Sequence, residues 1–228
     1  SSTRWHEFET LAPQVIWQPT GQALLNNPNV DAIISCLPWN ITETWLPELL
    51  ATEKPVLIEK PIALSSVALT SALPSCSSYP HNKYVGYNRR FYKTVQFLKN
   101  RVAKGGVKTV EITIPENIYG LSSTYGPEII DNILTYSSSH TLDIAVHILG
   151  KIHLVKIYGT PGTGYCKRFL SISGILETEH GCPVYLSIMG DNPAPMGIRI
   201  YFDDQTTWHL SPFERLVAYE GYEILQPT

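Results

Sequence analysis

Short apolar runs alternate with amphipathic segments through the first 90 residues of the chain. Apolar runs bounded by proline or glycine predict buried strands, and the amphipathic segments predict helices. Because strands that alternate with helices form parallel sheets, we expect a right-handed α/β layer here. The expected strands are 15–17, 30–37, 56–58 and 84–87, and the expected helices are 1–12, 20–26, 42–52 and 64–73.

The pattern changes after residue 90. Strands now follow one another without helices between them, which predicts an open antiparallel sheet. Residues 115–136 form a polar stretch longer than most structureless connections, which predicts a functional or partly ordered lid. The expected strands are 107–114, 152–158, 168–177, 184–189 and 197–202, and the expected helices are 91–103 and 141–149. The fold class is therefore α/β, with a partial Rossmann-type parallel sheet in domain 1–90 and an α+β domain with an open antiparallel sheet in 91–228.

The composition excludes several classes of protein. A net charge of −3 argues against a nucleic-acid partner, and no apolar run approaches the about 18 residues that cross a membrane. The four cysteines are scattered, which favours reduced thiols and a cytoplasmic protein. Only 16% of the residues are charged, so we expect a second subunit to cover part of the surface, in a homodimer or a higher homo-oligomer.

Two polar segments follow predicted strands. Glu59 and Lys60 come directly after strand 56–58, and Asn88, Arg89 and Arg90 follow strand 84–87. Ligands bind at the carboxyl edge of open α/β sheets, so these segments should lie at one binding edge. The alternatives are that Lys60 is an ordinary surface lysine and that one of the two arginines forms a surface salt bridge.

The helix predicted at 141–149 carries a narrow polar stripe. At about 100° per residue, His140, Asp143 and His147 lie within an arc of about 60°, between apolar residues. Three titratable groups on an otherwise apolar helix indicate the wall of a cleft. A buried His–Asp pair with a purely structural role is one alternative. A metal site is another, disfavoured because no cysteine or second His-rich segment lies nearby, and we expect no metal.

Three segments in order resemble the glucose–fructose oxidoreductase/inositol dehydrogenase (Gfo/Idh/MocA) family. They are Asn29–Leu64 with its Glu-Lys-Pro sequence at 59–61, then Val85–Phe91, then His140–His147 with Asp and His four residues apart. The resemblance implies a nicotinamide-dependent oxidoreductase with its active site in the cleft between its two domains. It also implies that Lys60, Asp143 and His147 are the catalytic residues.

Oxidation of an alcohol needs a hydride acceptor and a base for the hydroxyl proton. His147 suits the base, because imidazole titrates near neutrality. Asp143 lies one helical turn earlier and would orient the ring or bind substrate. Lys60 would stabilise the developing alkoxide. The other residues expected at the cofactor are Ser2, Arg4, Leu37, Pro38, Glu59 and Arg89, and those expected at the substrate are Asn88, Tyr119, Tyr125 and His140, besides the three catalytic residues.

The chain departs from the family pattern in two places. It contains no G-x-G-x-x-G phosphate turn, so we expect either a fragment of a longer protein or a relative that has lost the nucleotide cradle, and favour the fragment. Trp39 and Thr42 also stand where the family often has Asn and His. The family usually opens with a strand, a Gly-rich turn, a helix and a second strand, and nothing in this sequence matches them. Ser2 and Arg4 would follow that second strand and favour NADP over NAD.

We therefore expect an NAD(P)-dependent dehydrogenase or reductase. Its substrate would be a sugar, a sugar nucleotide or a polyol-like small molecule, with the hydride moving between nicotinamide and a hydroxyl or keto carbon. The alternative is a non-catalytic binding or assembly protein derived from the same family.

Overall fold

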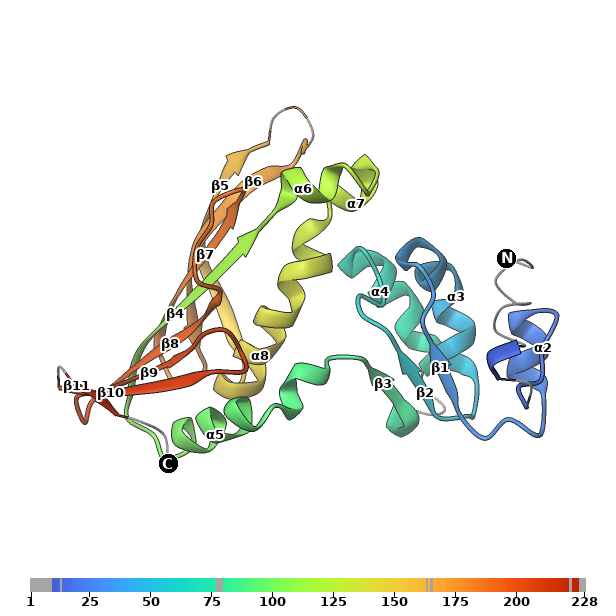
Figure 1. Ribbon diagram of the computed structural model, residues 1–228, viewed down its shortest axis with the longest axis horizontal. Coiled ribbons are helices and arrows are strands. Elements are labelled where there is room, and N and C mark those ends of the chain that lie inside the picture. The colour runs from blue at the N-terminus through green and yellow to red at the C-terminus, as the bar shows by residue number, and fades with distance from the viewer. Residues whose placement is uncertain are drawn as a thin grey trace.

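Two separate sheets, one of three strands and one of eight, organise the computed structural model of the chain (Figure 1). The structure describes residues 10–12, 14–76, 80–162, 164, 166–221 and 223–225. Each sheet has its own cluster of buried apolar side chains. The 3-10 helix η3 (Asn88–Phe91) lies in the connection between the two sheets, and the division at residue 90 stays a prediction.

The smaller sheet is parallel, as predicted, with the order β1 (Ile33–Ser35), β2 (Val56–Ile58) and β3 (Lys83–Val85). Apolar residues of β1 and β2 pack against Leu46, Leu49 and Leu50 of the helix between them. The helices of this part are α2 (Gly21–Asn26), α3 (Trp39–Ala51) and α4 (Ser66–Ala72), followed by the 3-10 helices η1 (Leu73–Cys76) and η2 (Pro80–Asn82).

One face of the smaller sheet is uncovered. Ile34, Leu57 and Tyr84 are in register across the three strands. Their exposed fractions are 71%, 40% and 56%. Parallel sheets usually carry helices on both faces, whereas the described helices of this part cover the face formed by Val56 and Ile58. The α/β layer is thus one-sided in the described part of the chain.

The larger sheet has the order β11-β10-β9-β8-β4-β7-β6-β5. All neighbouring strands run antiparallel except β4 and β7, so the expected antiparallel sheet is mixed at its centre. Its strands are β4 (Val107–Glu116), β5 (Ile152–Pro161), β6 (Phe169–Thr178), β7 (Pro183–Gly190), β8 (Gly197–Phe202), β9 (Thr206–Leu210), β10 (Leu216–Glu220) and β11 (Glu223–Leu225).

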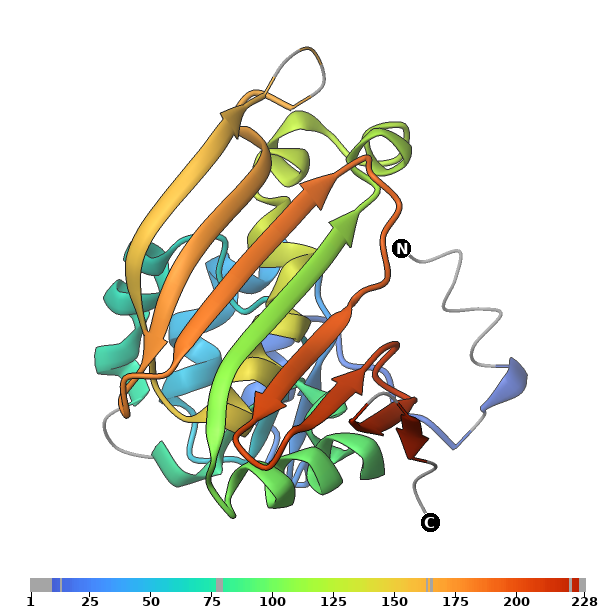
Figure 2. The ribbon, with the colours of Figure 1, turned by 90° about the vertical axis from the view of Figure 1, so that its left-hand side faces the viewer.

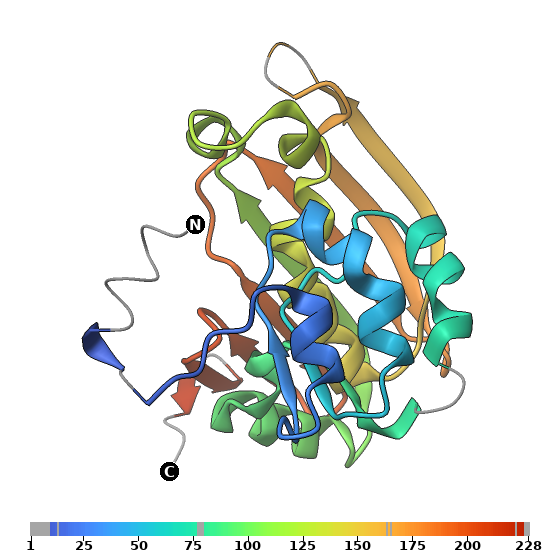
Figure 3. The ribbon, with the colours of Figure 1, turned by 90° about the vertical axis from the view of Figure 1, so that its right-hand side faces the viewer.

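One face of the larger sheet is covered by α5 (Lys93–Val102) and α8 (Ser139–Leu149) (Figure 3). Alternate residues of β4 face these helices, among them Val110, Ile112 and Ile114, which are all buried. No helix of the described residues covers the opposite face (Figure 2). The single covered face places α8 between the two sheets, where its polar side chains can meet the smaller one (Figure 1).

Several sequence predictions are wrong in detail. Residues 15–17 form no strand, and their side chains are exposed because no neighbouring strand pairs with them. The stretch 115–136 ends β4 and then forms α6 (Ile118–Ser122), α7 (Pro127–Ile130) and the start of the π-helix η4 (Leu134–Ser138). Strands β9, β10 and β11 were not predicted from the sequence. Most of the helix predicted at 1–12 lies outside the described residues.

Candidate active site

Lys60 lies directly after β2, at the carboxyl edge of the smaller sheet. Its Nζ donates a hydrogen bond to the carbonyl oxygen of Tyr136, 2.8 Å away, and lies 5.2 Å from the centroid of that tyrosine's ring. Burial lowers the pKa of Lys60, and the positive charge of Arg89 lowers it further, whereas the carboxylates of Glu59 and Glu116 oppose this shift. The ammonium is therefore held between the two sheets in a partly desolvated position.

His140, near the start of α8, faces the same region. Its ring meets Tyr87 edge-on, with 5.8 Å between the ring centroids. Burial, followed by the charges of Lys60 and Arg89, lowers the pKa of His140 to about 4. Its Nδ1 is buried and has no hydrogen-bond partner within the described structure. Buried polar atoms are nearly always paired, so a neutral imidazole with a bare nitrogen indicates a place for a ligand.

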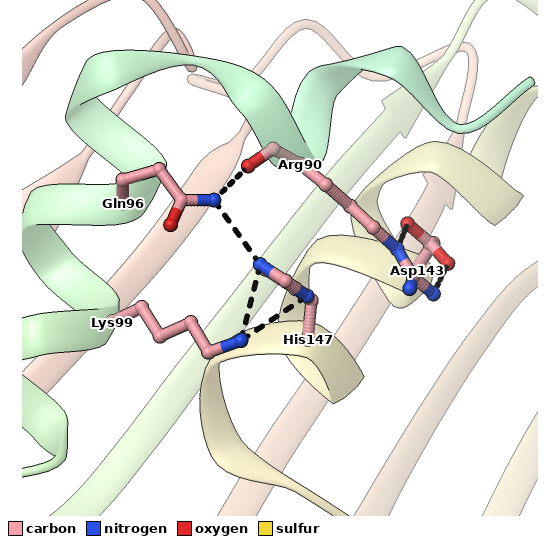
Figure 4. Close-up of polar contacts among 5 residues, drawn as sticks. All are labelled: Arg90, Gln96, Lys99, Asp143 and His147. Atoms are coloured by element: carbon pink, nitrogen blue, oxygen red, sulfur yellow. Dashed lines mark hydrogen bonds and ion pairs between the residues drawn. The ribbon is translucent and has the colours of Figure 1, made fainter.

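Asp143 and His147 lie further along α8 and contact η3 and α5 (Figure 4). Asp143 accepts two hydrogen bonds from Arg90, one of them 2.7 Å long from Nε. His147 Nε2 lies 3.3 Å from both Gln96 Nε2 and Lys99 Nζ. Burial and then the charge of Lys99 lower the pKa of His147. These contacts join α8 to the η3–α5 segment.

The catalytic role of the predicted trio of Lys60, Asp143 and His147 stays a prediction. Within the described residues, Lys60 makes no hydrogen bond or ion pair with either of the other two. The reason is the position along the helix: residues 136 and 140 lie at and before the start of α8, beside Lys60, whereas 143 lies further along α8 beside η3, and 147 lies beside α5. The group that the structure brings together is Lys60 with Tyr136 and His140.

An aromatic cluster covers this group. Trp39, the first residue of α3, stacks on Tyr125 at a centroid distance of 5.9 Å and contacts Tyr136. The Tyr136 hydroxyl donates to the Tyr125 hydroxyl at 3.3 Å, and burial raises the pKa of Tyr136 to about 12. Residues of the predicted lid thus reach across to the smaller sheet, beside Lys60.

The remaining residues predicted at the substrate are more scattered. Tyr119 is 69% exposed and lines a cavity of about 670 Å³ together with Glu116 and Asp191. Arg89 lies 5.2 Å above the ring of Phe213 and close enough to Lys60 and His140 to lower their pKa values. Asn88 is exposed in η3. Of these residues, Arg89 is electrostatically part of the Lys60 site.

The residues predicted to contact a nicotinamide line the same sheet edge where the structure describes them. The carbonyl of Leu37 accepts from the Thr42 hydroxyl at 3.0 Å, and Pro38 precedes α3. At the end of β1, the buried Ser35 hydroxyl has no partner among the described residues. A Cβ on Gly86 would lie 2.8 Å from a Glu59 carboxylate oxygen. Binding of a nicotinamide at this edge stays a prediction, and Ser2 and Arg4 lie outside the described residues.

Other kinds of site receive no support from the described residues. No group of three His, Cys, Asp or Glu side chains is arranged to hold a metal ion in the described part of the chain. No helix in that part is both long and apolar enough to cross a membrane.

Glu116, Tyr136 and Trp39 were not among the site residues predicted from the sequence. Glu116 continues the inward alternation of Val110, Ile112 and Ile114, so a carboxylate at that position was a readable signal. Tyr136 stands one helical turn before His140, the spacing that places two side chains on one face. Trp39 gave no signal of its partners, which come from a distant part of the chain.

Two curated proteins are similar to this chain. An uncharacterized oxidoreductase, YrbE, of Bacillus subtilis is 29% identical over 56% of the chain and 38% of its own length. The 4-carboxy-2-hydroxymuconate-6-semialdehyde dehydrogenase of Sphingobium sp. is 23% identical over 85% of the chain and 63% of its own length. The chain thus spans about two fifths to three fifths of these relatives. No protein-family model matches it.

Solved structures define the fold. A putative NADPH-dependent oxidoreductase from Desulfitobacterium hafniense superposes with a TM-score of 0.79 at 17% identity, over 96% of this chain and 69% of that one. The WlbA dehydrogenase from Bordetella pertussis, in complex with NADH and UDP-GlcNAcA, gives 0.75 at 16% identity, over 92% and 64%. The chain has the fold of NAD(P)-binding oxidoreductases of the Gfo/Idh/MocA type, and sugar dehydrogenases are among the proteins that share it.

Proposed function

We propose that this chain carries the catalytic edge of an NAD(P)-dependent oxidoreductase that acts on a hydroxyl or keto carbon of a sugar, sugar nucleotide or polyol-like molecule. The observation that carries the proposal is the bare, buried Nδ1 of His140, which faces the same region as the ammonium of Lys60. One group can donate to a substrate oxygen and the other can receive its proton.

The two side chains would divide the work. Lys60, released from the Tyr136 carbonyl or shared with it, would donate a hydrogen bond to the reacting oxygen and stabilise negative charge on it. The imidazole of His140 is neutral at neutral pH, because its pKa is lowered to about 4, so its lone pair can accept a hydrogen bond from the substrate hydroxyl. Lowered hydration of both groups strengthens these interactions.

A nicotinamide bound at the carboxyl edge of β1, β2 and β3 would supply the hydride acceptor or donor. Leu37, Pro38, Glu59 and Arg89 would lie around it. The chain has no G-x-G-x-x-G motif, so the phosphates of the cofactor would have to be bound by residues outside this sequence. The preference for NADP rests on Ser2 and Arg4 and stays a prediction that parallel assays with NADH and NADPH test.

The test separates His140 from the residue that the sequence favoured. In the full-length protein, with a panel of sugars and sugar nucleotides, we expect His140→Gln and Lys60→Met each to lower kcat about 100-fold or more. His147→Gln should lower it less than about 10-fold, because His147 contacts Gln96 and Lys99 and not Lys60. The reverse ranking would return the catalytic role to His147.

The rival proposal is a non-catalytic binding or assembly protein. Titration of the full-length protein with NADH and NADPH distinguishes the two, with Lys60→Met as the matched variant. Binding of neither nucleotide would favour the rival.

A cytoplasmic location fits the cysteines, none of which is paired within the described residues.

We also propose that the open face of the larger sheet packs against a second copy of the chain. Ile175 and Tyr185 are in register on β6 and β7, with exposed fractions of 39% and 50%. The same row continues through Glu111 to Arg199, so it presents apolar side chains and both charges and can complement itself about a twofold axis. Tyr185→Arg should lower the mass measured by light scattering, and an unchanged mass would reject this interface.

A further inference from the structure

Glu116 is a buried carboxylate on β4 of the larger sheet. It ends the inward row of β4 and is 5% exposed. Among the described residues no lysine, arginine or histidine forms an ion pair with it. Burial raises its pKa, against the hydrogen bonds of Ser138 and Ser137 and the charge of Lys60. A charged group in such a position is costly unless something compensates it, so its place in the fold needs a reason.

The reason that the geometry suggests is the π-helix η4. At the middle of this helix, the carbonyl of Tyr136 accepts from Lys60 Nζ at 2.8 Å and from the Ser139 hydroxyl at 3.3 Å. At its last residue, the Ser138 hydroxyl donates to Glu116 Oε1 at 2.7 Å. Single π-turns occur often at functional sites, and this one is tied to Lys60 and Glu116 within three residues.

The charges around Lys60 come from every element that meets there. Glu59 is its neighbour after β2, Arg89 comes from η3, Glu116 from β4 and His140 from α8. Arg89 disfavours the charged ammonium, while Glu59 and Glu116 favour it. Among the described contacts, Glu116 but not Glu59 is hydrogen-bonded to η4, the helix whose Tyr136 carbonyl accepts from Lys60.

We propose that Glu116 is a positioning residue for Lys60. It fixes the π-helix whose carbonyl receives the ammonium, and its negative charge keeps that ammonium protonated in a partly desolvated site. This role rests on the proposed function only where it concerns turnover. The link between Glu116 and Lys60 is a property of the folded chain itself.

The experiment measures the reactivity of Lys60 directly. The full-length protein is labelled with acetic anhydride over a series of pH values, and the labelled peptide is quantified by mass spectrometry. Only the free amine reacts, so the profile gives the pKa of Lys60. We expect the isosteric Glu116→Gln to lower that pKa by about half a pH unit, which is about threefold more free amine below the midpoint.

Glu111→Gln is the matched control, because Glu111 stands on the same strand but on its outer face, paired with Arg199. Equal profiles for Glu116→Gln and Glu111→Gln would overturn the proposal. Ser138→Ala offers a second variant that keeps the carboxylate and removes the hydrogen bond. It should raise the labelling rate of Lys60 at fixed pH about twofold by loosening the π-helix, and an unchanged rate would also overturn the proposal.

Turnover is a separate readout. Where the full-length protein is active, Glu116→Gln should move the alkaline limb of kcat/KM to lower pH by the same about half unit, with a smaller effect on KM. Where it is inactive but the labelling profile shifts, the proposed function fails and the role of Glu116 stands. A shifted activity profile with an unshifted label would reject Glu116 and keep the function.

Discussion

The stability of this protein should fall between neutral and mildly acidic pH because of His140. The folded protein holds the pKa of His140 at about 4, against an ordinary value of 6.5. Between these two pH values, His140 is mostly protonated in the unfolded chain and mostly neutral in the folded chain. The stabilisation is therefore fully present above pH 6.5 and is lost as the pH falls towards 4.

The size of the effect follows from the two pKa values. Going from about pH 7.5 to about pH 5, a shift of this size costs about 2 kcal/mol of unfolding free energy. His140 is only half-buried, so solvent screening reduces the figure, and we expect about 1 kcal/mol. The cost has a visible cause, since a proton on His140 would place a second positive charge beside Lys60 and Arg89.

Urea unfolding followed by circular dichroism at the two pH values measures this loss. His147 and His209 also have lowered pKa values and contribute to the total. The comparison of the parent with His140→Gln isolates one residue, because the variant retains the other two. We expect the variant to lose about 1 kcal/mol less than the parent over the same interval. Equal losses, within a few tenths of a kcal/mol, would refute the account of His140 as a desolvated imidazole among cations.

Two further predictions concern α8, and each uses the same urea assay. Asp143→Ala should lower the free energy of unfolding by about 2 kcal/mol, because its carboxylate is only 9% exposed and is paired with the guanidinium of Arg90. The control Glu111→Ala removes a solvent-exposed ion pair and should lower it by under about 1 kcal/mol. Similar losses would mean that the ion pair between α8 and η3 does not stabilise the fold. Ile144→Ala should cost about 2–4 kcal/mol, because Ile144 is fully buried against the larger sheet, whereas Val146→Ala, at a position 47% exposed, should cost under about 1 kcal/mol. A small loss for Ile144→Ala would show that this side of α8 is loosely packed.

Local sequence predicted most of the architecture. The apolar run at 56–58 and the run at 197–202 coincide with β2 and β8, because a strand bounded by turn residues needs few long-range contacts to be recognised. The expected strand at 15–17 failed because a strand exists only where another strand pairs with it. The change from parallel to mostly antiparallel pairing was also predictable, but the parallel contact of β4 with β7 was not, since it joins segments far apart in the chain.

The choice of site residues shows the same limit. The stripe of His140, Asp143 and His147 is a property of one helix, and the helix forms as expected. Which of the three faces Lys60 depends on where α8 sits between the two sheets and on the π-turn before it. Arg90 contacts Asp143 and Lys99 contacts His147, and both of these cations come from outside α8.

By itself, the sequence determined the order of most elements, the change to mostly antiparallel pairing after residue 90 and the presence of a lysine at a parallel sheet edge. These follow from hydrophobic periodicity and from the placement of proline and glycine, which act over a few residues. Tertiary structure decided the rest: the meeting of Lys60 with Tyr136 and His140, the aromatic cover from Trp39, and the carboxylate of Glu116 behind the π-helix. Each of these pairs spans a long stretch of chain, and both desolvation and charge depend on distance in space, which local sequence does not encode.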